Sequence, residues 1–363
     1  MWIACLGCTP SMDGVDASTD GGTDAPAIDA GPPLRVASVV DLGFFPLPSD
    51  TTVGRDGVSS GAIGGAILWT FGDTFVTDSA TTVDMSNVVT ATGGWSTAAS
   101  PLMLEQPVDS HGIPSQMVPY TAPELAQNRM DATNGWALWP GAVIDTGGSE
   151  ALLLFQRIQR MNGSGFVGVG LGTAHIAPHA TVATRDPNDL FSRSVGSSDP
   201  LYGTGGVSVI GDTVYWFACD SLVCRLARTP RAHAGERDAF EFYDGSAWVS
   251  DIAAAAIVIR GVVSEVSVSY NAHLGRYLAV SSQLGTDSVV LRTAPAIEGP
   301  WPTSGLTIMP SDGGILAATD GRDYLAKEHP ALSSSDGREI VISYSRPLGN
   351  FRGEVHLARI TLE

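Results

Sequence analysis

Acidic and aromatic residues recur at corresponding points along this 363-residue chain. Two carboxyl groups that flank a glycosidic bond can hydrolyse it, one as an acid and the other as a base or nucleophile. Aromatic rings can pack against the apolar faces of sugars. The pattern therefore indicates a carbohydrate site, with Asp56, Glu265 and Glu328 as acids and Trp139 and Tyr202 as aromatic residues.

The spacing of these residues predicts that they lie together. Trp139, Tyr202, Glu265 and Glu328 follow one another at intervals of 63 residues, and Asp56 lies 83 residues before Trp139. A fixed period indicates repeated units that bury their apolar faces against their neighbours. A unit of this length accommodates four strands, the content of one propeller blade. Five units predict an all-β, single five-bladed β-propeller whose innermost strands bring the recurring residues to its axis.

A dense apolar run follows each of these starts, as expected for a strand in the middle of a sheet. The extra length of about 20 residues in the first unit falls within 91–135, where alternation is weak, and we expect it at a rim beside a binding cleft. The last strand can complete the fifth unit or pair with Leu34–Leu42. The five apolar runs are Ile67–Phe71, Ala151–Phe155, Thr213–Phe217, Arg276–Val280 and Glu339–Ser343.

Asp73 is a further candidate acid, because it follows Asp56 by 17 residues in the segment FGDTF. A hairpin of antiparallel strands would bring both side chains to the same end of the axis. The alternative is structural, since an Asp in a GRDG or GDT turn often accepts backbone N–H groups.

The remaining candidates also have structural alternatives. Glu265 could be a solvated carboxylate at a rim, and Glu328 with His329 could form a turn before Pro330. Trp139 could belong to the core.

Several motifs resemble a family of bacterial five-bladed propellers that was long labelled as a domain of unknown function and whose characterised members include endo-D-arabinanases. The resemblance covers about residues 40–363 and is more distant to the arabinanase and fructosidase propeller hydrolases. The motifs are GRDG with LWTFGDTF, WPGAVID, YGTGGVSV, YNAHLGRY with APAIEGPW, and EHPAL.

The resemblance implies that Asp56 and Asp73 are the catalytic acids. The repeat adds Glu265 and Glu328 as candidate catalytic residues. The candidate substrate-binding residues are Arg55, Trp139, Tyr202, Asn271 and His329.

Two functions remain open at this point. The first is a glycoside hydrolase that acts on an arabinan-like polysaccharide by carboxylate acid–base catalysis. The second is a non-catalytic propeller that binds glycan or protein at the cell surface. The expected partner is a polysaccharide or oligosaccharide, and we expect a monomer. We expect no cofactor or metal, because no second Cys or His pair stands at zinc-ligand spacing.

The charge of the chain limits its partners. With 38 acidic and 20 basic residues the net charge is −18, which disfavours nucleic acid or an anionic membrane surface.

The four cysteines form two pairs. Cys219 and Cys224 bracket a short loop between two strand-like runs, so we predict a disulfide across a hairpin in an oxidising compartment. Two reduced thiols are the alternative. The other pair, Cys5 and Cys8, stands near the start of the chain.

The segment 1–8 resembles the end of a bacterial lipoprotein signal, with small residues before Cys5 or Cys8 as the lipidated position. Residues 9–35 are rich in Asp, Gly and Pro and predict a disordered tether, since they cannot bury enough apolar area to fold. The propeller then occupies 36–363. We therefore expect an exported protein, either an outer-membrane or cell-surface lipoprotein or periplasmic, that meets the membrane only through a lipid anchor.

Overall fold

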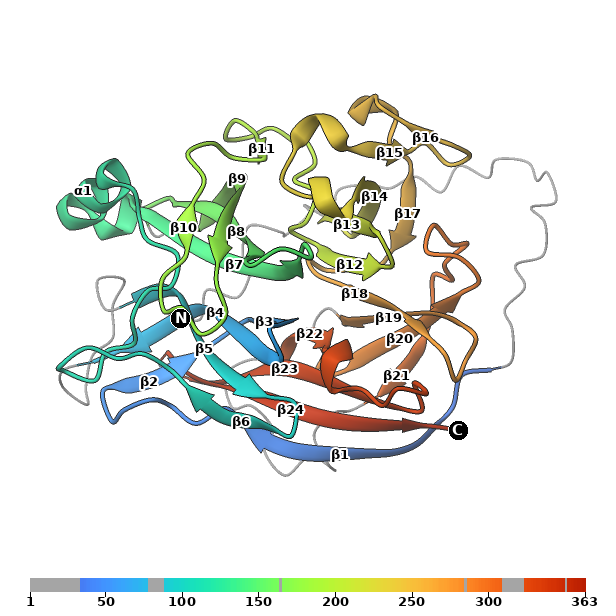
Figure 1. Cartoon of the computed structure of the whole chain (residues 1–363), viewed down its shortest axis with the longest axis horizontal. Coiled ribbons are helices and arrows are strands. Elements are labelled where there is room, and N and C mark those ends of the chain that lie inside the picture. The colour runs from blue at the N-terminus through green and yellow to red at the C-terminus, as the bar shows by residue number, and fades with distance from the viewer. Residues whose placement is uncertain (1–32, 78–87, 163–164, 284–285, 309–322, 350) are drawn as a thin grey trace.

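The computed structural model describes residues 33–77, 88–162, 165–283, 286–308, 323–349 and 351–363. Cys5, Cys8 and nearly all of the expected tether lie outside these residues. Within them the fold is all-β with few helices, and the strands form four hydrogen-bonded sheets arranged around a common centre (Figure 1). The first strand of the described residues is β1 (Val36–Phe44).

The largest sheet has nine strands and joins the first and last strands of the described residues. Seven of its strands are hydrogen-bonded in the order β22 (Tyr324–Glu328), β23 (Glu339–Gly349), β24 (Arg352–Leu362), β2 (Thr52–Arg55), β4 (Ala66–Val76), β5 (Val88–Thr97) and β6 (Ser100–Glu105). The other two are β1, which pairs with β24, and β3 (Val58–Ile63), which pairs with β4.

The other three sheets follow one another along the chain. One contains β7 (Trp136–Asp145), β8 (Ala151–Arg160), β9 (Phe166–Ile176), β10 (Thr184–Arg185) and β11 (Phe191–Ser192). The next contains β12 (Gly206–Ile210), β13 (Thr213–Asp220), β14 (Val223–Pro230), β15 (Glu241–Tyr243), β16 (Trp248–Val249) and β17 (Ile257–Arg260). The last contains β18 (Ser267–Asn271), β19 (Arg276–Ser282), β20 (Val289–Ala294) and β21 (Leu306–Ile308).

All five apolar runs predicted as strands are confirmed, since they lie within β4, β8, β13, β19 and β23. The two possibilities for the last strand both hold. β24 pairs with β23 in its own sheet, and it also pairs antiparallel with β1, from Val36 opposite Leu362 to Phe44 opposite His356. An end strand covered in this way is not left as an open edge.

Apolar side chains fill the junctions between successive sheets. One buried cluster joins β4 to β8, a second joins β8 to β13, and a third joins β13 to β19. A fourth joins β19 to β23, and a fifth joins β23 back to β4. The core is therefore a ring of intersheet contacts around the centre, which is a propeller-like arrangement.

The segment 91–135, in which alternation is weak, contains regular elements. Most of β5, all of β6 and the helix α1 (Ala122–Met130) lie there. The alternation of apolar residues in β5 is interrupted by Gly93. A side chain is excluded at this position, because a Cβ atom there would come within 2.6 Å of the Trp69 carbonyl oxygen. A signal for α1 is present in the sequence, since Thr121 and Glu124 form a capping box.

Five short 3-10 helices complete the helical content of the described residues: Ala132–Asn134, Arg231–His233, Arg237–Ala239, Ile252–Ala254 and Pro330–Leu332. Among those residues, no helix has both the length and the apolar character needed to cross a membrane.

The predicted disulfide between Cys219 and Cys224 is present. The two residues are opposite each other where β13 turns into β14, and their Cα atoms are 4.1 Å apart. The bond closes the hairpin at its tip.

Candidate functional site

Asp56 and Asp73 lie side by side at one end of the β3–β4 hairpin. Asp56 lies between β2 and β3, and Asp73 belongs to β4, which pairs with both strands. The Asp56 N–H donates to the Asp73 carbonyl at 3.0 Å, and the Asp73 N–H donates to Asp56 Oδ1 at 3.1 Å. Gly57 continues the turn at a φ of +54°, a conformation that glycine adopts readily. The hairpin that we expected from the 17-residue spacing therefore brings the two acids together.

Two other parts of the ring donate hydrogen bonds to these carboxylates. The Tyr324 hydroxyl, from β22, donates to Asp56 Oδ2 at 2.7 Å. The Trp139 indole N–H, from β7, donates to Asp73 Oδ1 at 3.0 Å, and the ring lies 4.6 Å from that of Phe166. Trp139 therefore reaches the acid pair, but it contacts the pair through its N–H group.

The surroundings raise the pKa of both acids. Burial raises the pKa of Asp56 to about 7, the charge of Asp73 adds to this, and the hydrogen bond from Tyr324 opposes it. The pKa of Asp73 is also raised by burial, but the positive charge of Arg160 and the hydrogen bond from Trp139 act in the opposite direction. As residues, Asp56 and Asp73 are half-buried.

These differences allow the two acids to take different roles near neutral pH. Asp56 holds a proton at pH values where an ordinary Asp has lost it, so it can donate one. Asp73 has a cation and an indole N–H that favour its ionised form, so it can act as the base. Two titratable groups whose environments separate their pKa values form an acid–base pair.

Glu265 lies near the pair but is bound to a cation. Its Oε2 is 2.5 Å from Lys327 Nζ, and the same ammonium donates to Ser59 Oγ at 2.9 Å. The Glu265 charge still contributes to the raised pKa of Asp56. Because its own charge is neutralised, Glu265 fits the role of an electrostatic neighbour better than that of the acid or base.

Glu328 and His329 are buried at the end of β22. Glu328 accepts hydrogen bonds from Ser269 at 2.6 Å and Ser333 at 3.1 Å, and burial raises its pKa. His329 Nδ1 is 2.7 Å from Ser60 Oγ, and burial lowers the pKa of this imidazole to about 3. These residues tie β22 to its neighbours and do not point freely into solvent.

The structure places three of the predicted substrate-binding residues outside the site. Arg55 is fully buried and donates a hydrogen bond to Gln106. Neighbouring residues of an extended chain point to opposite sides, so Arg55 points away from the site when Asp56 points into it. Tyr202 is fully buried in the cluster between β8 and β13. The Asn271 side chain donates a hydrogen bond to the Gly337 carbonyl and accepts one from the Leu274 N–H, which lies in the β18–β19 turn. We correct these assignments, since these side chains have little or no contact with solvent.

The sequence interpretation missed Tyr324, Lys327 and Arg160. Lys327 and Tyr324 precede Glu328 on the same short strand, and Arg160 ends β8. Lys327 directly precedes Glu328, one of the residues at the 63-residue spacing, and this position was the available signal for it. Nothing in the spacing indicated that Arg160 would act on Asp73.

The described part of the chain contains no group of three or more His, Cys, Asp or Glu side chains that could hold a metal ion.

A family model described as "Domain of unknown function (DUF4185)" matches residues 56–347. The chain belongs to the DUF4185 family. No curated protein matches it. The match begins at Asp56 and includes Asp73, Trp139 and Tyr324, so all four side chains of the acid pair and its donors belong to the DUF4185 domain.

Solved structures share the fold of this DUF4185 domain at low sequence identity. A candidate hydrolase from Bacteroides ovatus is 15% identical, with a TM-score of 0.59 over 88% of this chain and 86% of that one. A GH43_1 enzyme from Xanthomonas citri is 13% identical, with a TM-score of 0.52 over 88% and 90%. An alpha-L-arabinofuranosidase from Podospora anserina, in complex with cellotriose, is 12% identical, with a TM-score of 0.50 over 90% and 97%. The DUF4185 domain therefore has a glycoside hydrolase-type, propeller-like fold.

The raised pKa of Asp56 predicts how the stability of the DUF4185 domain depends on pH. Its pKa of about 7 exceeds the usual 3.8, so the folded state binds this proton more tightly, and the stability gained is lost as pH rises through 7. Asp56→Asn removes the ionisation. We expect the variant to be more stable than wild type at pH 8 by roughly 2 kcal/mol, and to lose most of this advantage at pH 4.

Urea denaturation of both proteins at pH 4 and pH 8 measures this difference. The control is Asp212→Asn, an exposed carboxylate in the β12–β13 turn, which should give no pH-dependent difference. A variant that is less stable than wild type at pH 8 would show that Asp56 serves mainly as a turn cap.

Proposed function

We propose that this protein is a glycoside hydrolase that acts on an arabinan-like polysaccharide, with Asp56 as general acid and Asp73 as its ionised partner. The observation that carries the proposal is the pair itself: two carboxyl groups held together by one hairpin, with raised pKa values and different hydrogen-bond donors. The likeness to GH43 and arabinofuranosidase structures supports the reaction class.

The proposed reaction follows from these groups. Asp56 donates its proton to the glycosidic oxygen as the bond from that oxygen to the anomeric carbon breaks. Asp73 either takes a proton from the attacking water, which gives inversion, or attacks the anomeric carbon itself and forms a covalent glycosyl-enzyme intermediate. Water that gives its proton to Asp56 then hydrolyses this intermediate, which gives retention. The pKa of Tyr324 is raised well above its ordinary value by burial and by Asp56, so its hydroxyl remains a donor that holds Asp56 in place.

We further propose that the fold is a five-bladed propeller. The nine-stranded sheet then counts as two blades, β3–β6 and β22–β24 with β1, joined through β2. Five apolar clusters at successive junctions support this count. The innermost strands β3, β7, β12, β18 and β22 contact their neighbours in that order.

Substitution of either acid tests the proposed reaction. We expect Asp56→Asn and Asp73→Asn each to lower turnover by about 10²-fold or more, since positioned acid–base groups contribute ~10²–10⁴. The measurement is release of reducing ends from arabinan, with melting temperatures recorded on the same samples. A well-folded, fully active Asp56→Asn protein would eliminate the catalytic role of Asp56. A folded wild-type protein that binds arabinan but releases no reducing ends would instead favour the non-catalytic glycan-binding module.

Tyr324→Phe tests the assignment of Asp56 as the acid. The hydrogen bond from Tyr324 lowers the pKa of Asp56, so its loss should raise that pKa. We expect the alkaline limb of the kcat/KM profile, at about pH 7 in wild type, to move to higher pH. A structural role for Tyr324 would lower activity without moving the limb, and an unchanged or acid-shifted limb would contradict the assignment.

We also propose that the protein is exported and anchored by a lipid on Cys5 or Cys8. The disulfide supports an oxidising compartment. Mass spectrometry of protein from its native membrane should find a lipidated N-terminal peptide. An unmodified peptide that begins at Met1 would contradict the anchor.

A further inference from the structure

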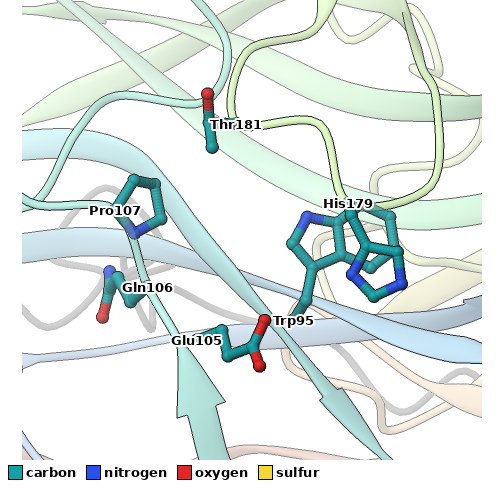
Figure 2. Close-up of a pocket in the computed structure, with 6 residues that line it drawn as sticks. All are labelled: Trp95, Glu105, Gln106, Pro107, His179 and Thr181. Carbon is teal, nitrogen blue, oxygen red and sulfur yellow. The ribbon is translucent and has the colours of Figure 1, made fainter.

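A cavity of about 290 Å³ lies between β5, the end of β6 and the loop after β9 (Figure 2). A second hollow of about 210 Å³ adjoins it and adds Ser96, Thr97, Ser100 and Met103 to the lining. The cavity is lined by Trp95, Glu105, Gln106, Pro107, His179 and Thr181.

The strand register separates this cavity from the candidate catalytic site. Thr90 of β5 is opposite Asp73, whereas Trp95 is opposite Leu68 near the other end of β4. Five residues along a strand correspond to about 17 Å. The cavity therefore belongs to the end of the β3–β4 hairpin that carries its tight turn, and the acids belong to the opposite end.

The lining has features of a binding site. His179 has a φ of +61°, an uncommon and costly conformation for a residue other than glycine, and such strain gathers at functional sites. Its ring lies 5.3 Å from the Trp95 ring, and the Trp95 N–H is held by the Ala180 carbonyl at 2.9 Å. The loop therefore presents an exposed imidazole over a fixed aromatic ring.

The opposite wall is polar. The Gln106 carbonyl oxygen accepts from the buried guanidinium of Arg55 at 2.9 Å, which fixes the orientation of this amide. The amide nitrogen of Gln106 is buried and has no hydrogen-bond partner among the described residues. Glu105, next to it in the chain, is exposed and can accept hydrogen bonds.

We infer that this cavity is a second carbohydrate site, which binds a neutral sugar unit of a polysaccharide. Sugar hydroxyls both donate and accept, so one ring can donate to Glu105 and accept from Gln106 and His179. The pyrrolidine of Pro107 offers apolar surface for the sugar C–H groups, whereas Trp95 is buried and supports the His179 imidazole by ring contact. The Glu105 carboxylate and the net charge of −18 disfavour an anionic ligand. Binding here requires no hydrolysis, so it stands independently of the proposed reaction.

The test measures binding in the Asp56→Asn background, so that turnover does not consume the polymer. Affinity gel electrophoresis is run with arabinan, arabinoxylan and, as a polymer control, dextran. We expect arabinan or arabinoxylan to retard the protein. The double substitution Glu105→Ala/His179→Gly should weaken the apparent Kd about tenfold, the effect of losing about 1.4 kcal/mol of hydrogen bonding. Gly accepts the backbone conformation at position 179, so the melting temperature should not fall.

The matched control is Glu236→Ala/His233→Ala, which removes another exposed carboxylate–imidazole pair, 2.9 Å apart, after β14. This variant should bind as the Asp56→Asn parent does. Equal retardation of the two double variants, or no retardation of the parent by either arabinose polymer, would overturn the inference. So would a loss of retardation caused by Trp139→Ala alone, since the polymer would then bind only beside the acid pair. Hydrolysis by Asp56→Asn at the wild-type rate would instead count against the proposed role of Asp56 and leave the binding result readable.

Discussion

The burial of two neighbouring carboxyl groups, those of Asp56 and Asp73, is the constraint that much of the surrounding structure satisfies. Burial raises the pKa of both acids, and the charge of Asp73 raises that of Asp56 further, so the pair holds a proton to higher pH. A hydroxyl from β22, an indole from β7 and the charge at the end of β8 offset part of the cost of this burial. Without these groups the burial of the two carboxyl groups would cost more free energy, and their pKa values would differ less.

These compensating groups come from distant parts of the chain, so the site depends on closure of the ring. Tyr324 stands 268 residues after Asp56, and Trp139 stands 66 residues after Asp73. The apolar clusters between neighbouring sheets hold the strands at the distances that these hydrogen bonds need. The pairing of β1 with β24 ties the start of the folded part to its end. The acid pair is therefore a property of the assembled ring as well as of one hairpin.

Two regions of the first sheet have different chemistry at opposite ends of the same strands. One end of β4 and β5 carries the acid pair, and the other carries the cavity at Trp95 and His179. A polymer bound at the cavity would be held near the protein at a raised local concentration without occupying the acid pair. Strand direction keeps the two places apart, because a rigid β-strand fixes the distance between residues along it.

The sequence by itself determined the all-β class, the five central strands, the hairpin disulfide and the meeting of Asp56 with Asp73. Each of these depends on local patterns: a strand alternates or is buried over a few residues, and a hairpin joins residues a short distance apart. Only the tertiary structure decided which recurring residues reach the site. Tyr202 stands at the predicted spacing but packs between two sheets, whereas Tyr324 lies before its predicted start and reaches Asp56. The direction of a side chain at the axis depends on strand register and on how neighbouring sheets pack, and these contacts join residues that are far apart in the chain.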